Sequence, residues 1–272
     1  MKEYILLHND FYPKSAFILT ENLKKLCQKL QIPIAGIQKI ACENRLLPFV
    51  DELKYYGQIL RALVEAQKKE SKLLVYDSQT LLGILEFFRK YYEDLEFKEQ
   101  LLKDFGIEVD ILELEKCFVF MPEVILQNIK GLHKKRRWEG FKCAFLLDRE
   151  LEKIVRDYYL IEEFENILGL KILTFYKDSL DYLLLSNKRL AHKMGGRDYY
   201  EMVDCGVDCI ITPNIGNFEL LDRNAHENKR ASGRDDLEIP LLFIPQIFLA
   251  LFEEFGASDL LFDQHIIAPK ML

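Results

Sequence analysis

The sequence predicts an α/β protein made of two similar parallel-sheet lobes. Three observations predict this fold class. Short buried strands alternate with amphipathic helices, polar residues follow the strands, and the order of these elements repeats about halfway along the chain. Strands joined through helices pair in parallel, because each crossover returns the chain to the same end of the sheet. We therefore expect an internal duplication, residues 1–138 and 139–272, with lobes related by a pseudo-twofold axis.

The first half contains three short apolar runs that predict strands, at residues 4–8, 32–37 and 73–76. Apolar residues at helical spacing predict helices over residues 15–30, 49–69 and 80–92, with two further helical pieces around 95–105 and 122–131. Asp77 and Ser78 are good N-cap residues for the helix that begins near Thr80.

The second half repeats this alternation. Strands are predicted at residues 143–147, 172–176, 209–212 and 239–243, and helices over 150–167, 180–193, through Tyr200, and over 246–255. Gly195-Gly196 is expected to end the helix at 180–193, because glycine is the favoured residue just after a helix. The highly charged segment 222–238 is expected to be a long loop, either a mobile lid or a disordered segment.

The two halves match in spacing more than in residue identity. Equivalent positions are 137 or 138 residues apart, and they pair Asp10 with Asp148, Asp77 with Asn214, Thr80 with Asn217, and Cys42-Glu43 with Ser179-Leu180. Each of these residues follows a predicted strand. Because ligands of α/β proteins bind at the carboxyl ends of strands, we expect the polar groups to face a crevice shared by the lobes.

A resemblance to a known family rests on the segment GVDCIITPNIGNFELLD, the later segment IPLLFIPQIFLALF, and the ending FDQHIIAPKML, in which His265 occupies a recurrent histidine position. The chain resembles the cysteine-rich (CCG) domain proteins typified by the B-type subunit of heterodisulfide reductase. The resemblance implies a duplicated α/β fold in which each repeat carries a Cys, then Cys-Cys-Gly, then Cys-x-x-Cys, and binds iron–sulfur clusters.

The sequence departs from the family at the cysteines. Asn214-x-x-Asn217 and Asp77-x-x-Thr80 replace the two Cys-x-x-Cys pairs, Asp10 and Asp148 stand near the first cysteines, and only Cys42 is expected to survive. Clusters are held by thiolates, and amide groups are poor substitutes. We therefore expect no iron–sulfur cluster and no bound metal, and the catalytic residues stay unknown.

Two functions compete. The first is a non-catalytic subunit, assembly or scaffold partner of an oxidoreductase complex. The second is an enzyme or sensor that binds a small anion or carboxylic acid in the crevice. Strand-end residues begin helices there, and the N-terminus of a helix favours an anion. The candidate binding residues are Asp10, Cys42, Glu43, Asp77, Thr80, Asp148, Asn214, Asn217 and His265. Their carboxylates and His265 could also supply acid–base chemistry or hold a hard divalent ion. Against this, Asp and Asn at helix starts are commonly simple caps, and His265 could only anchor the tail.

Charge and cysteine content limit the remaining possibilities. The formal charge of −7 argues against a nucleic-acid partner, and the basic run at 134–137 is interpreted as a solvated linker. No signal peptide or membrane span is expected, which places the protein in the cytoplasm. The six cysteines are interpreted as reduced core thiols. Thiol redox chemistry through Cys42 or the Cys205/Cys209 pair is a weaker alternative.

Overall fold

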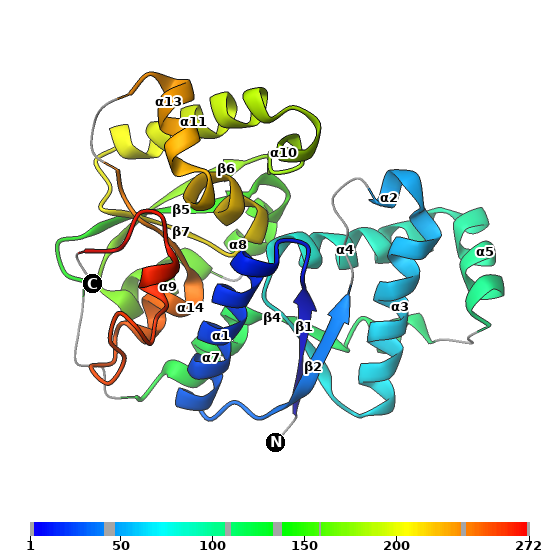
Figure 1. Cartoon of the computed structure of the whole chain (residues 1–272). Helices are drawn as coiled ribbons and strands as arrows, with labels where there is room; N and C mark the ends of the chain where they lie inside the picture. The colour runs from blue at the N-terminus through cyan, green and yellow to red at the C-terminus, as the bar shows by residue number, and fades with distance from the viewer. Residues whose placement is uncertain are drawn as a thin grey trace. The chain divides into compact units, whose positions relative to one another are not determined.

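The computed structural model describes residues 3–40, 47–106, 110–132, 138–157, 159–234 and 238–270. The chain divides into two compact units (Figure 1). Unit 1 comprises Met1–Phe11 and Leu30–Asn128, and unit 2 comprises Tyr12–Lys29 and Ile129–Leu272.

Unit 1 is built on a four-stranded parallel sheet in the order β2-β1-β3-β4. Its strands are β1 (Tyr4–Asn9), β2 (Ile34–Ile40), β3 (Lys72–Val75) and β4 (Phe118–Phe120). Its helices are α2 (Leu47–Val50), α3 (Glu52–Lys68), α4 (Ser78–Glu93), α5 (Leu95–Phe105), α6 (Ile111–Leu114) and α7 (Met121–Ile129), whose last residue belongs to unit 2. The central strands are buried on both faces, which explains their continuous apolar runs.

Unit 2 repeats this sheet, with the parallel order β6-β5-β7-β8. Its strands are β5 (Lys142–Asp148), β6 (Lys171–Lys177), β7 (Cys209–Thr212) and β8 (Leu241–Phe243). Its helices are α1 (Pro13–Lys29), α8 (Glu152–Asp157), α9 (Leu160–Leu168), α10 (Leu183–Ser186), α11 (Lys188–Asp204), α12 (Ile215–Phe218), α13 (Ala225–Ser232) and α14 (Ile244–Leu249), with 3-10 turns at Arg149–Leu151 and Phe262–Gln264 and a π-helical turn at Glu219–Arg223.

The matching strand orders confirm the predicted α/β class with two parallel sheets. The fourth strand of unit 1, β4, was not predicted, because three residues are too few to give a strand pattern in the sequence. The pseudo-twofold axis and the crevice shared by the lobes stay predictions.

Helix α1 belongs to unit 2, although the strands on either side of it in the chain belong to unit 1. It packs against α14 and α12 and buries an apolar stripe that includes Leu19, Leu23 and Leu26. The buried Asn22 amide donates a 3.2 Å hydrogen bond to the carbonyl oxygen of Leu260. The repeat boundary at residues 138/139 stays a prediction, and the compact units follow a different division of the chain.

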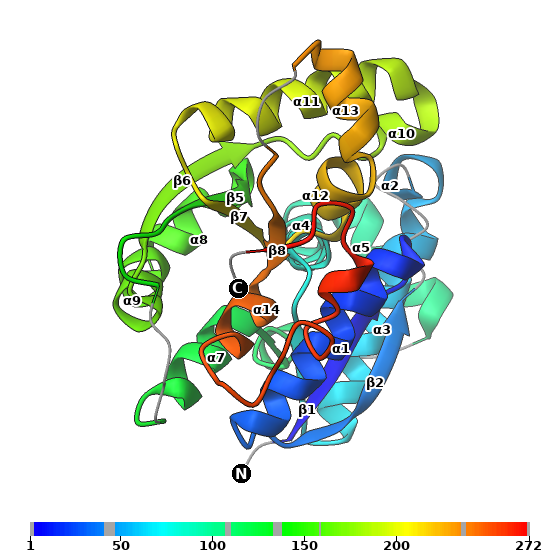
Figure 2. The ribbon, with the colours of Figure 1, turned by 60° about the vertical axis from the view of Figure 1, so that its left-hand side comes forward.

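Two predictions around α11 are wrong. Gly195-Gly196 does not end a helix but lies in the middle of α11, which packs beside α13 (Figures 1 and 2). A Cβ atom at Gly196 would lie 2.7 Å from the carbonyl oxygen of Asn228, so glycine is needed there for close helix packing.

The segment 222–238 is not a long loop. Its described part continues the π-helical turn Glu219–Arg223 and then forms α13, which ends at Gly233 in the left-handed conformation typical of a C-cap. The density of charged residues reflects an exposed amphipathic helix, with Ala225 and Asn228 buried against its neighbours.

No helix among the described residues combines the length and the apolar character that crossing a membrane requires.

Candidate functional site

Two buried polar side chains meet at the carboxyl end of the sheet in unit 2. Asp148 is the last residue of β5, and Asn214 lies two residues after the neighbouring strand β7. Nδ2 of Asn214 lies 2.9 Å from both carboxylate oxygens of Asp148, and both residues have no exposed surface. A hydrogen bond to a buried carboxylate is stronger than one between neutral groups, so this pair fastens the two strand ends together.

Asn214 also begins the next helix. Its Oδ1 accepts a 2.9 Å hydrogen bond from the backbone N–H of Asn217, and this confirms the expected N-cap. The backbone N–H of Asn214 donates to the hydroxyl of Thr212, which itself donates to the carbonyl oxygen of Leu146 on β5. Both ends of the Asn214 amide are thus used. Nδ2 of Asn217, by contrast, is buried and has no hydrogen-bond partner among the described residues.

Unit 1 has an equivalent pair at the ends of β1 and β3, formed by Asn9 and Asp77. Nδ2 of Asn9 lies 3.5 Å from Oδ2 of Asp77 and 3.5 Å from Oγ1 of Thr80. The same Asp77 oxygen accepts the backbone N–H of Thr80 at 3.0 Å and its hydroxyl at 2.9 Å. Asp77 is therefore the N-cap of α4, as predicted. Thr80 donates its backbone N–H to Asp77, just as Asn217, at the matching position of unit 2, donates its backbone N–H to Asn214.

The predicted pairing of Asp10 with Asp148 is wrong by one residue. In unit 1, Leu7 pairs with Val75, two residues before Asn9 and Asp77 respectively. In unit 2, Phe145 pairs with Ile211, three residues before Asp148 and Asn214. Asn9 therefore lies opposite Asp77 in unit 1 as Asp148 lies opposite Asn214 in unit 2. The residue that corresponds to Asp148 is Asn9 and not Asp10. The half-exposed Asp10 carboxylate instead lies 3.8 Å from the ammonium of Lys39 on β2.

A second polar group in unit 2 follows β6 and was not predicted as a site. The hydroxyl of Ser179 donates a 2.8 Å hydrogen bond to Asp181, whose carboxylate lies against Gly216: a Cβ atom there would be 2.5 Å from Cγ of Asp181. Tyr12, just before α1, donates to the carbonyl oxygen of Asp181 at 3.2 Å. Burial and the neighbouring Asp181 carboxylate raise the pKa of the Tyr12 phenol, which therefore stays protonated. The sequence carried no signal for this contact, because 169 residues separate its partners.

His265 lies in a separate buried group. Its Nε2 is 2.8 Å from Nε2 of Gln246, and its Nδ1 is 3.3 Å from Oδ2 of Asp222, with both the His265 and Asp222 side chains fully buried. The other oxygen of Asp222 accepts the backbone N–H of Ile266 at 3.1 Å. Aromatic rings of Phe218 and Phe262 contact the imidazole edge-on. These contacts hold the C-terminal segment in place, which favours the anchoring interpretation of His265 over a role at the strand ends.

Cys42 and Glu43 lie outside the described residues, as does the basic run at 134–137. Whether the polar groups of the two units face one crevice stays a prediction. Among the described residues, no three His, Cys, Asp or Glu side chains are grouped so that they could hold a metal ion.

No disulfide joins the described cysteines to one another, and their positions disfavour thiol chemistry. Cys205 is exposed at the end of α11, whereas Cys209 is buried in β7 opposite Cys143 of β5. Burial raises the pKa of the Cys143 thiol well above its ordinary value, and it raises the pKa of the Cys27 thiol to about 12. A thiol with a raised pKa is a poor nucleophile at neutral pH.

A match to a known family covers Asn214 and Asn217 at the strand ends of unit 2 but not Asp148, which precedes it. Residues 180–266 match the HdrB-like C-terminal domain. This HdrB-like C-terminal domain runs from Leu180 after β6 to Ile266 beside Asp222, and it includes Asn214, Asn217 and His265. It covers about a third of the chain. A search of the curated proteins found no match.

A solved structure shows the same fold over nearly the whole chain. A hypothetical protein from Helicobacter pylori matches 97% of this chain with a TM-score of 0.78 at 19% sequence identity. The match covers 53% of that protein, so the present chain spans about half its length. A putative Asp/Glu racemase from Yersinia pestis matches 92% of this chain and 96% of its own at 13% identity, with a TM-score of 0.36, too low to support an argument.

Proposed function

We propose that this chain is a relative of the B-type subunit of heterodisulfide reductase that lacks an iron–sulfur cluster, and that it acts as a non-catalytic subunit, assembly or scaffold partner of an oxidoreductase complex. The observation that carries the proposal is the hydrogen bond between Asn214, which lies in the HdrB-like C-terminal domain, and Asp148 at the end of β5. The resemblance implies a Cys-x-x-Cys pair where Asn214 and Asn217 stand and a further cysteine near Asp148.

The donor atoms at the strand ends do not suit an iron–sulfur cluster. They are carboxylate, amide and hydroxyl groups of Asp148, Asn214 and Ser179, and iron–sulfur clusters require thiolates. The oxygen atoms are also already engaged, since Asp148 accepts from Asn214 and Asn214 accepts from Asn217. The side chains of Asp148 and Asn214 therefore satisfy each other where relatives would bind the cluster, and this supports a structural role for this pair.

The decisive experiment measures iron and acid-labile sulfide in the protein purified without oxygen. We expect neither in stoichiometric amount and no visible absorption of a cluster. A Cys42→Ser variant is the matched control, because it removes the thiol that lies outside the described residues but was expected to survive. Stoichiometric iron and sulfide that disappear in the variant would contradict the proposal.

The partner role needs its own test. The tagged chain is expressed in its native cells, and its complexes are separated on native gels and identified by mass spectrometry. We expect it to migrate with other proteins of an oxidoreductase complex. Migration only as a free chain, or only with unrelated proteins, would contradict this part of the proposal.

One observation favours the second candidate function, binding of a small anion or carboxylic acid. Nδ2 of Asn217 is a buried donor without a partner among the described residues, and a bound carboxylate would satisfy it. A thermal-shift screen with carboxylic acids and phosphates tests this candidate. A stabilising compound should lose its effect on an Asn217→Ala variant and keep it on a variant of the exposed Lys153.

A further inference from the structure

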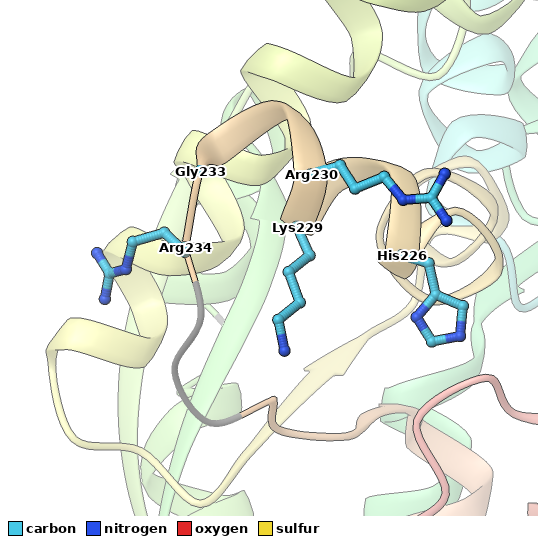
Figure 3. Close-up of a pocket in the computed structure, with 5 residues that line it drawn as sticks. All are labelled: His226, Lys229, Arg230, Gly233 and Arg234. Carbon is cyan, nitrogen blue, oxygen red and sulfur yellow. The ribbon is translucent and has the colours of Figure 1, made fainter.

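Helix α13 of unit 2 carries a basic surface, which we define as His226, Lys229, Arg230 and Arg234. With Gly233 these residues line an open surface cavity of about 430 Å³ (Figure 3). Among the described residues, the lining of this cavity includes three Lys or Arg and no Asp or Glu, whereas the whole chain carries a formal charge of −7. A positive surface on a negatively charged protein orients acidic partners as they approach.

Two of the four basic side chains are already paired with carboxylates of the chain. The ammonium of Lys229 lies 3.6 Å from Glu238. Arg234 donates two hydrogen bonds to Asp204, at 2.6 and 3.1 Å, and its guanidinium lies 4.7 Å from the ring centre of Tyr200. These contacts hold Arg234 at one end of the basic surface, and they show that side chains of this surface pair with carboxylates.

His226 and Arg230 have no such pairing. Both are exposed, and within the described part of the chain neither forms an ion pair or a side-chain hydrogen bond. They are four residues apart on α13 and point to the same side (Figure 3). Two neighbouring carboxylates of an incoming chain could pair with both at once.

The directions of the side chains decide the kind of ligand. His226 and Arg230 point to one side of α13, Arg234 points to the opposite side, and Lys229 points downward between them in this view (Figure 3). Tight binding of a compact anion such as phosphate needs several donors that converge on one point, and these side chains point in different directions. An extended acidic chain could follow the surface and contact them in turn.

We propose that the basic surface of α13 docks an acidic segment of a partner protein. This inference rests on the proposed function, in which the chain is a partner of an oxidoreductase complex. It assigns the basic surface of α13 as the docking surface and an acidic segment as the part of the partner that binds there. Because the pairs are solvent-exposed, each contributes modestly, and binding should weaken steeply with salt.

The test uses the full chain and a fluorescent decaglutamate peptide, with binding followed by fluorescence anisotropy at low salt. Arg230→Glu should weaken binding by about fivefold or more, because it removes an attraction and adds a repulsion. Raising sodium chloride from about 20 mM to about 300 mM should have a similar or larger effect.

The matched control is Lys153→Glu, which changes the net charge equally. Lys153 is exposed, but it lies beside Glu150 and Glu152 in a cavity of mixed charge. Its substitution should change binding by less than about twofold. Equal weakening by both variants would mean that only net charge matters, and it would overturn the inference.

Tripolyphosphate separates the extended ligand from a compact one. If tripolyphosphate bound tightly in an Arg230-dependent way and the peptide did not, the surface would be a compact anion site and the inference would be wrong. Absence of peptide binding would overturn it as well. Neither result depends on iron content, so the proposed absence of a cluster is tested separately.

Discussion

The strand ends of the two units contain the same pair of residue types in opposite positions. In unit 1 the amide is on the first strand and the carboxylate begins the helix, as Asn9 and Asp77; in unit 2 the carboxylate is on the strand and the amide begins the helix, as Asp148 and Asn214. Each pair thus contains one charge, and each joins two neighbouring strands. We expect the presence of the pair to matter more for stability than which strand carries the carboxyl group.

Because the amide and the carboxylate exchange positions between the units, the two carboxylates are stabilised by different donors. Asp77 caps α4 and accepts the N–H and hydroxyl of Thr80, so its carboxylate has donors other than Asn9, which is 3.5 Å away. Asp148 receives the Asn214 amide on both oxygens at 2.9 Å. We therefore expect unit 2 to be the more sensitive to changes in its pair. Trp138, the single tryptophan, is buried in unit 2 and reports on its unfolding by fluorescence.

The largest effect is expected from Asn214→Asp, which would place two buried carboxylates within hydrogen-bond distance. We expect a loss of about 3–5 kcal/mol in the free energy of unfolding at neutral pH. One of the two carboxyl groups would then have a folded-state pKa above its unfolded value of about 3.9. The destabilisation relative to the unmodified protein should therefore be smallest below about pH 4 and should grow as the pH rises through the raised folded pKa. Urea titrations at several pH values, followed by Trp138 fluorescence, measure this, and a pH-independent loss would contradict it.

Removal of the amide in each unit compares the two pairs directly. Asn214→Ala takes the hydrogen bond from a buried carboxylate and also removes a helix cap, and it should cost about 2–4 kcal/mol. Asn9→Ala should cost about 1 kcal/mol, because Asp77 keeps its contacts with Thr80. Urea unfolding followed by circular dichroism measures both variants. Equal losses would show that the two strand ends are equivalent in energy despite their different geometry.

Glycine substitutions test how closely helices pack in each unit. Gly196→Ala should cost about 1–3 kcal/mol, because the new Cβ would meet the backbone oxygen of Asn228 and push α11 from α13. In Gly83→Ala in α4, the new Cβ would meet chiefly the hydroxyl end of the Tyr55 side chain, and alanine has a higher helix propensity than glycine. The free energy of unfolding should therefore fall by less than about 1 kcal/mol. Thermal unfolding of the two variants checks the difference, and a larger loss for Gly83→Ala would contradict it.

The smallest effect is expected when unit 2 is given the arrangement of unit 1. In the double variant Asp148→Asn with Asn214→Asp, an amide on the strand again faces one carboxylate, and Asp caps a helix as well as Asn does. The free energy of unfolding should fall by less than about 1 kcal/mol, although Asn214→Asp alone is severe. Failure of Asp148→Asn to rescue Asn214→Asp, measured by Trp138 fluorescence, would refute the equivalence of the two pairs.

The sequence predicted features that depend on residues close together in the chain better than features that depend on residues far apart. Short-range patterns worked: Asp77 and Asn214 were predicted as helix caps, and the alternation of elements predicted both sheets. The equivalence of Asp10 and Asp148 failed by one residue, because spacing between halves cannot fix strand register, whereas the pairing of neighbouring strands does.

Predictions about glycine and charge failed for a different reason. Gly195-Gly196 has the composition of a helix end, and segment 222–238 has the composition of a loop. In the fold, Gly196 lets α13 approach α11 and Gly195 faces Leu220 of the π-helical turn, and this packing stabilises a helix in the charged segment. Tertiary contacts override local propensity in both places.

The sequence by itself determined the class of fold, its duplication and the polar residues that follow each strand, since periodicity and capping act within a few residues of the chain. Only the tertiary structure decided that Asn9 replaces Asp10, that α1 packs in unit 2, and that Asp148 and Asn214 bond to each other. Those outcomes depend on strand register and on contacts between residues tens to hundreds of positions apart, and no local pattern records them.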